Sequence, residues 1–133
     1  MDEGVVSCKW AIDSGASHHI CKDRSKFVKF KEKIYPSHIT VANAGECKIL
    51  GGGIVEERMI QVDWSIRIAK IENVLYIPSM KKNLLSIPQL RKKFVTIFEG
   101  ERIKIVSKLS GKCIAPGELE NGLYWLKTFS QQE

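Results

Sequence analysis

No apolar run in this sequence approaches the roughly 20 residues that a helix needs to cross a bilayer. The first residues also lack the basic-then-apolar order of a secretory signal peptide. Internal repeats and low-complexity stretches are absent, and a composition of 44% hydrophobic and 27% charged residues is that of a globular protein, not a disordered one. We therefore expect a cytoplasmic protein with no membrane contact, and its 133 residues suit a single domain, 1–133.

The sequence lacks the cysteine spacing of common zinc modules, since no Cys-x-x-Cys pair occurs. The four cysteines are Cys8, Cys21, Cys47 and Cys113. Together with the neighbouring His18 and His19, two of them (Cys8 and Cys21) would supply enough ligands for a metal. The alternative, which we favour, is that the cysteines are free and mostly buried thiols in a reducing compartment.

Acidic residues are outnumbered, with 21 basic against 15 acidic side chains and a net charge of +6. The basic excess is concentrated in Lys22–Lys33, where lysines alternate with Phe27 and Phe30. Basic residues interleaved with aromatic ones are typical of a nucleic-acid surface. The phenylalanines serve equally well as core anchors between solvated lysines, and we favour that interpretation over a nucleic-acid partner.

Short runs of β-branched and aromatic residues, cut by glycine, asparagine, proline and serine, predict a protein built mostly from strands. The predicted strands are Lys9–Ile12, His38–Ala42, Cys47–Leu50, Ile54–Val62, Ser65–Glu72, Val74–Ile77, Phe94–Phe98, Arg102–Ser107, Lys112–Ala115 and Leu123–Lys127. Turns are predicted at 43–45, 51–53, 99–101, 110–111 and 121–122. Strands this short with tight turns favour an all-β sandwich or barrel.

One segment has helical spacing, because Leu84, Ile87 and Leu90 lie three residues apart and basic residues follow them. Pro88 is compatible with a helix only near its start, where the missing N–H is not needed. We therefore predict one short helix that begins near Ile87, with 83–86 as a tight lead-in.

The segment Trp10–Ser17 contains the strongest candidate for chemistry. Its apolar residues lead into Asp13, then Ser14 and Gly15. An aspartate at the end of an apolar strand needs hydrogen-bonding partners. Gly15 allows a sharp turn there, and the hydroxyl of Ser14 can hold it. Taken alone, however, Asp-Ser-Gly is a short match that often marks only a turn.

The wider pattern resembles the aspartic proteases of copia-type LTR retrotransposons, which belong to the retropepsin family and use Asp-Thr-Gly or Asp-Ser-Gly. Residues 38–50, with Asn-Ala-Gly at 43–45, resemble the flap hairpin of that family, and 51–55 resemble the glycine-interrupted strand after it. Asn73–Pro78 and Lys82–Ser86 are similar to its second hydrophobic strand and helix. Gly117–Leu126 resembles the join to the next polyprotein segment, so 117–133 is expected to lead toward the pre-integrase region. The resemblance covers essentially the whole chain.

The resemblance implies a retropepsin-like closed β-barrel with one short helix and extra C-terminal strands. It also implies an aspartic endopeptidase that processes a Gag–Pol polypeptide, is itself cut from a longer polyprotein and works in the cytoplasm within virus-like particles. Each chain would contribute one aspartate to a homodimer, and no cofactor or metal would be required. The implied roles are Asp13 as the catalytic residue, Ser14 and Gly15 as its support, and Ala16, Ser17, Asn43, Ala44 and Gly45 as substrate-binding residues.

The sequence departs from the family pattern in three places. Many retropepsins have an acidic residue two positions after the glycine, where this chain has Ser17. They also begin with a hairpin before the catalytic strand, for which this chain has no room, and this chain adds Phe94–Lys127 after the helix. Two alternatives therefore stay open: a catalytically silent barrel that acts as a binding or assembly module, and a basic nucleic-acid-binding barrel.

Overall fold

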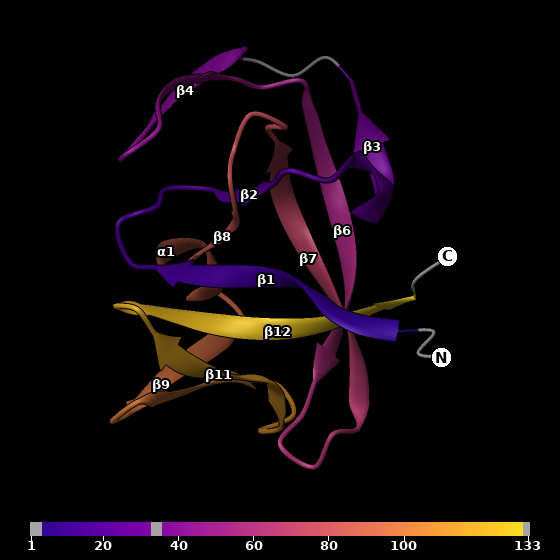
Figure 1. Cartoon of the computed structure of the whole chain (residues 1–133), viewed down its shortest axis with the longest axis vertical. Coiled ribbons are helices and arrows are strands. Elements are labelled where there is room, and N and C mark those ends of the chain that lie inside the picture. The colour runs from indigo at the N-terminus through magenta and orange to yellow at the C-terminus, as the bar shows by residue number, and fades with distance from the viewer. Residues whose placement is uncertain (1–3, 33–35, 132–133) are drawn as a thin grey trace.

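The computed structural model describes residues 4–32 and 36–131, which form twelve strands, one 3₁₀ turn and one α-helix (Figure 1). The elements before the helix are β1 (Gly4–Asp13), β2 (His19–Cys21), η1 (Arg24–Lys26), β3 (Phe27–Lys31), β4 (His38–Val41), β5 (Gly45–Lys48), β6 (Gly51–Ile60), β7 (Ile66–Tyr76) and β8 (Asn83–Ser86). They are followed by α1 (Ile87–Leu90), β9 (Phe94–Glu99), β10 (Arg102–Ser107), β11 (Cys113–Glu120) and β12 (Leu123–Gln131).

Six of these strands close into a barrel in the order β6, β7, β2, β8, β1 and β12. The ring closes where Thr128 of β12 pairs with Met59 of β6. Strand β8 lies between β1 and β2 and is parallel to β1 but antiparallel to β2. The predicted all-β closed barrel with one short helix is therefore confirmed.

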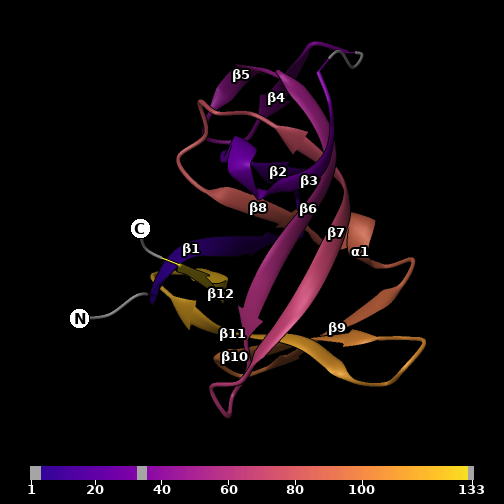
Figure 2. The same ribbon diagram turned by 90° about the vertical axis from the view of Figure 1, so that its right-hand side faces the viewer.

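Two apolar clusters flank the barrel wall, since successive side chains of a strand point to opposite faces. The inner cluster is centred on Trp10, Val55, Ile103 and Leu126, each no more than 1% exposed. The second cluster lies on the other face, beneath the separate hairpin formed by β4 and β5. Both views of the molecule place this hairpin above β2 and β8 (Figures 1 and 2).

The C-terminal residues are part of the barrel and extend beyond it. Strand β12 pairs antiparallel with β1 from Gly4 to Ile12, and β11, β10 and β9 continue the sheet outward from β12. The predicted extra C-terminal strands are thus present. Strand β12 thus covers one edge of β1.

Three strands were not expected from the sequence, and one predicted turn is wrong. Strands β2 and β3 were missed, and the lead-in 83–86 is the extended strand β8. The glycines at 51–53 lie inside β6, where β3 pairs with Gly52 and Gly53. A Cβ at Gly53 would lie 2.0 Å from the carbonyl oxygen of Lys29, so only glycine fits there.

A buried carboxylate joins three elements inside the barrel. Glu57 is 1% exposed, accepts a hydrogen bond from Trp10 Nε1 at 2.8 Å and lies 3.4 Å from the ammonium group of Lys26. Burial raises the pKa of Glu57, while the contacts with Trp10 and Lys26 oppose that rise. This network ties β1 and η1 to β6.

Candidate active site

Asp13 lies where the first strand emerges from the core. The three residues before it, Trp10, Ala11 and Ile12, are at most 6% exposed, whereas Asp13 is partly exposed. The chain then turns, and the backbone N–H of Gly15 donates to Asp13 Oδ1 at 2.8 Å. This contact is an Asx turn, which fixes the direction of the carboxylate. A Cβ at Gly15 would lie 3.4 Å from that oxygen, an ordinary contact, so this fold does not itself require glycine there.

The loop after Asp13 is held by the junction of β8 and α1. Asp13 pairs with Ser86, whose side chain is fully buried. The hydroxyl of Ser86 donates to the carbonyl oxygen of Ala16 at 2.6 Å and accepts from the backbone N–H of Gln89 at 3.3 Å, as an N-cap residue does. The side-chain amide of Gln89 donates to the carbonyl oxygen of Ser17 at 3.0 Å. We call Ser86 and Gln89 the loop clamp.

His19 completes the attachment of the loop. Its ring is 4% exposed, and Nδ1 accepts a hydrogen bond from the backbone N–H of Ser86 at 2.9 Å. A neutral imidazole with this bond carries its proton on Nε2. Burial, helped by the charge of His18, lowers the pKa of His19 from 6.5 to about 4. His19 is therefore neutral near pH 7 and serves as an acceptor.

The β4–β5 hairpin covers the face of β1 to which Asp13 belongs. Ala11 and Asp13 share one face of the strand because side chains alternate along it. Ala11 belongs to the same apolar cluster as Cys47 of β5, against which Ile39 and Val41 of β4 pack. The hairpin thus stands over the Asp13 side of the barrel wall.

The tip of this hairpin is small and exposed. Asn43 and Gly45 have positive φ values of 67° and 73°, and the N–H of Ala44 donates to the carbonyl oxygen of Val41 at 3.0 Å. A Cβ at Gly45 would meet nothing within 4 Å, so the tip is open to solvent. Such a tip can bend while its two strands remain paired.

The predicted site residues thus fall into two groups. Asp13, Ser14, Gly15, Ala16 and Ser17 form one turn, and residues 43–45 form the hairpin tip on the same side of the barrel. The structure records no hydrogen bond or ion pair between Asp13 and a second carboxylate among the described residues. Within residues 4–32 and 36–131, no group of three His, Cys, Asp or Glu residues could hold a metal ion.

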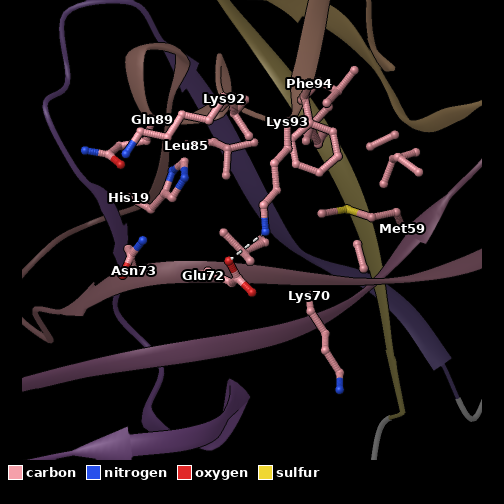
Figure 3. Close-up of a pocket in the computed structure, with 17 residues that line it drawn as sticks. His19, Met59, Lys70, Glu72, Asn73, Leu85, Gln89, Lys92, Lys93 and Phe94 are labelled. Atoms are coloured by element: carbon pink, nitrogen blue, oxygen red, sulfur yellow. Dashed lines mark hydrogen bonds and ion pairs between the residues drawn. The ribbon is translucent and has the colours of Figure 1, made fainter. Parts of the chain in front are cut away.

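A cavity of about 250 Å³ lies beside Gln89 of the loop clamp (Figure 3). It is lined by His19 and Gln89 together with apolar residues such as Leu85 and Phe94. An ion pair between Lys93 and Glu72, 3.2 Å long, lies at its rim. Because Asp13 is not among its lining residues, this cavity is not where a substrate would meet the carboxylate.

The basic segment has no free aromatic platform among its described residues. Phe27 is 7% exposed, and the rings of Phe27, Phe30 and Tyr76 pack edge to face at 5.2–5.8 Å. The guanidinium group of Arg24 lies 3.8 Å from the centre of the Phe30 ring. These contacts support the interpretation of the aromatics as anchors of β3.

Comparison with known proteins assigns the barrel to a class. Residues 10–95 match the family described as "Pol polyprotein, beta-barrel domain". The chain belongs to this family of Pol polyprotein β-barrel domains.

A relative from Saccharomyces cerevisiae is the putative transposon Ty5-1 protein YCL075W, which is 28% identical over 81 residues. The match covers 61% of this chain and 49% of that protein, so it spans only about half the length of the relative. No solved structure matches the chain. In the described part of the chain, no helix is long and apolar enough to span a membrane. The comparisons thus place the chain in the Pol region of a retrotransposon.

Proposed function

We propose that this domain is an aspartic endopeptidase that processes a retrotransposon Gag–Pol polyprotein. The observation that carries the proposal is the position of Asp13, at the end of a buried strand, in a clamped turn and on the side of the barrel wall covered by the β4–β5 hairpin. A carboxylate held in this way can act repeatedly on a substrate without being reoriented. The reaction would take place in the cytoplasm, within virus-like particles.

The chemistry requires two carboxylates, and a homodimer supplies them as Asp13 of each copy. Two adjacent carboxylates do not both ionise readily, so the pair shares one proton and titrates as a unit. The ionised member removes a proton from a water molecule as that water attacks the peptide carbonyl carbon. The protonated member donates its proton to the carbonyl oxygen, which gives a neutral tetrahedral diol.

The remaining site residues would orient the pair and the substrate. Ser14 would hydrogen-bond across the dimer axis, and Gly15 would let the substrate backbone approach. Ala16 and Ser17 would border the cleft, and Asn43, Ala44 and Gly45 would close over the peptide. Gly15 is consistent with such a role, because the fold of one chain leaves room for a Cβ at that position.

The pairing of β1 with β12 removes one objection to this function. A catalytic strand with an unpaired edge would be poorly supported. Strand β12 pairs with β1 up to Ile12, directly before Asp13. The support of the strand is therefore provided from the other end of the chain.

The test compares Asp13→Asn with Asp63→Asn, a matched control. Asp63 also accepts a hydrogen bond from the N–H two residues later, at 3.0 Å, but lies in an exposed turn. The wild-type chain and both variants would be incubated between pH 4 and pH 8 with a proteome-derived peptide library, and cleavage read by mass spectrometry. We expect Asp13→Asn to remain folded and lose at least 1,000-fold in turnover, because an amide cannot act as the ionised base.

Asp63→Asn should keep wild-type turnover. If the wild-type chain cleaves no peptide at any pH, the domain is the silent binding or assembly module instead. If folded Asp13→Asn cleaves as fast as wild type, Asp13 has no part in the mechanism.

A further inference from the structure

Strand β7 has an edge that is paired over only part of its length. On one side the strand pairs with β6 from Ile66 to Tyr76. On the other side it pairs with β2, and only from Val74 to Tyr76. Among the described residues, no strand pairs with this second side of residues 66–73. We call residues 66–73 the free edge of β7.

The alternation of hydrogen bonds shows which main-chain groups point out of the free edge. The N–H of Gln61 donates to the carbonyl oxygen of Ser65 at 2.8 Å, so these two residues form a hydrogen-bonded pair. In an antiparallel ladder such pairs alternate with pairs that do not bond to each other. The main chain of Ala69 therefore bonds to β6, whereas Ile68 and Lys70 present their N–H and C=O groups to the free edge. An edge of this kind is a template for a further strand.

The cavity beside Gln89 opens along this edge (Figure 3). Five consecutive residues, 69–73, line it, although successive side chains of a strand point to opposite faces. The edge of the strand, not one of its faces, is therefore turned toward the cavity. Figure 3 agrees with this, since the side chain of Lys70 points away from the cavity. Leu90 of α1 and Phe94 of β9 also line the cavity.

The cavity is large enough for one large apolar side chain. Its volume is about 250 Å³, and an apolar cavity of about 150 Å³ already holds a benzene ring. Ala69 and Ile71 of β7 face the inner apolar cluster, which also forms the floor of the cavity. On a strand added along the free edge, every second side chain would lie on this same face. Such a side chain would enter the cavity.

The outer face of β7 carries apolar and basic side chains. Ile68 is 61% exposed, and Lys70 is exposed on the same face. At the mouth of the cavity Lys93 and Glu72 pair at 3.2 Å, whereas Lys70 and Lys92 form no ion pair within the described residues. An acidic strand would meet these unpaired cations favourably. A second copy of the chain would bring the same cations and a net charge of +6, so it fits the edge less well.

We infer that the free edge of β7 is the docking site for an extended, acidic segment of a partner polypeptide. The segment adds a strand beside β7, in line with β2, and bonds to the outward main-chain groups of Ile68 and Lys70. A large apolar side chain on its inner face fills the cavity, and a carboxylate on its outer face lies opposite Lys70. The inference uses none of the predicted site residues, so it holds whether or not the domain is a protease.

Amide hydrogen exchange, followed by NMR, tests the edge itself. In the unbound chain, the N–H groups of Ile68 and Lys70 should exchange about 100-fold faster than those of Ala69 and Ile71, which bond to β6. If Ile68 and Lys70 exchange as slowly as Ala69, the edge is not open and the inference is overturned. On addition of a bound peptide, the exchange at Ile68 and Lys70 should slow, because a strand then covers them.

The binding probe is a set of fluorescent peptides of about seven residues, the length of an ordinary strand. Each has leucine, methionine, phenylalanine or tryptophan at its centre and glutamate on both sides of it, since neighbours in a strand point to opposite faces. We expect at least one peptide to bind the full chain with a dissociation constant below about 1 mM. Alanine at the centre, or lysine in place of the glutamates, should weaken that binding at least tenfold. Failure of all four peptides to bind would overturn the inference.

A proline variant tests the main-chain bonds. Ile68→Pro removes an outward N–H without removing a bond to β6, and edge strands tolerate proline at such positions. The matched control is Thr96→Pro in β9, whose N–H also points away from its one partner strand but which does not line the cavity. We expect at least tenfold weaker peptide binding in Ile68→Pro and unchanged binding in Thr96→Pro. Equal losses in the two variants would contradict docking at β7.

A charge reversal keeps the test decisive if a proline variant fails to fold, which thermal unfolding would show. Lys70→Glu should weaken the glutamate peptides at least tenfold and strengthen the lysine peptides. Lys29→Glu, at an exposed residue of β3, should change neither. Unchanged binding of both peptide sets in Lys70→Glu would overturn the inference. Sedimentation equilibrium adds a last outcome: a wild-type dimer that is lost in Ile68→Pro would assign the edge to a second copy and contradict the proposed partner.

Discussion

Two turns of this molecule use the same hydrogen bond in very different surroundings. In one, Asp13 Oδ1 accepts from the N–H of Gly15 at 2.8 Å; in the other, Asp63 Oδ1 accepts from the N–H of Ser65 at 3.0 Å and from its hydroxyl at 2.6 Å. The hydrogen bonds from Ser65 lower the pKa of Asp63. Within the turn itself, the Asp63 carboxylate is therefore held by at least as many hydrogen bonds as the Asp13 carboxylate.

The difference lies in what surrounds each turn. The Asp63 turn joins β6 to β7 in solvent, and Trp64 within it is 77% exposed with a φ of 70°. The Asp13 turn follows a buried strand and is held by Ser86, which is fully buried and belongs to another part of the chain. An Asx turn orients a carboxylate, but only tertiary contacts give it a fixed position relative to the barrel. We therefore expect changes of pH and single substitutions to affect stability and turnover differently in the two regions.

The largest expected difference is in pH dependence, because the Asp13 loop ends in a buried histidine and the Asp63 turn has none. The folded state takes up the proton of His19 near pH 4, whereas the unfolded state does so near pH 6.5. Between these values the unfolded state binds more protons, so stability falls as the pH falls through this window. The loss is about 3 kcal/mol by pH 4.

Urea unfolding of wild type, His19→Gln and His18→Gln at several pH values checks this expectation. The fall attributed to His19 should disappear in His19→Gln and persist in His18→Gln, whose ring is exposed. Equal slopes in all three proteins would show that His19 titrates normally.

We expect an intermediate difference in stability and turnover when Ser86, which holds the Asp13 turn, and Ser65, in the Asp63 turn, are each replaced by alanine. Ser86→Ala removes the hydroxyl that serves both Ala16 and Gln89, and should cost about 2 kcal/mol of the free energy of unfolding. Turnover should fall at least tenfold, since the loop loses its clamp. Ser65→Ala, in the exposed turn, should change stability by less than about 0.5 kcal/mol and leave turnover unchanged. Similar losses of stability and turnover in both variants would show that Ser86 holds the Asp13 turn no more firmly than Ser65 holds the Asp63 turn.

The smallest expected change in stability concerns the hairpin over Asp13. Gly45→Val and its control Gly111→Val place a branched side chain at φ values of 73° and 72°, in turns where a Cβ would meet nothing within 4 Å. Each should cost about 1 kcal/mol of backbone strain. Turnover should fall strongly only in Gly45→Val. If melting temperature and turnover change alike in the two variants, the hairpin is an ordinary surface turn.

Local patterns in the sequence were sufficient to predict most of the strands. Strand β10 was predicted with its observed bounds, Arg102–Ser107, and the helix was predicted to begin near Ile87, where α1 begins. Strand β8 was missed because Leu84 and Ile87 continue the helical spacing of Leu90. Its extended form comes from pairing with β1 and β2 on either side, which no local pattern records.

The candidate site was predicted only in part, for the same reason. Asp13 was recognisable because it follows an apolar run and precedes Ser14 and Gly15. Ser86 carries a local signal only for its role as N-cap, since it stands two residues before Pro88. Its bond to Ala16 spans 70 residues, and no periodicity links such distant positions.

The pairing of β1 with β12 has a consequence for synthesis of the chain. The first strand leaves the ribosome early, but its partner, which begins at Leu123, is made more than 100 residues later. At about 5–20 residues per second, β1 waits on the order of 10 s for that partner. Contacts so distant in sequence also form late in folding, because they close the longest loop. Strand β1, with Asp13 at its end, therefore gains its full support only when the whole domain has been translated, and a partly made chain cannot hold the Asp13 turn in its final place.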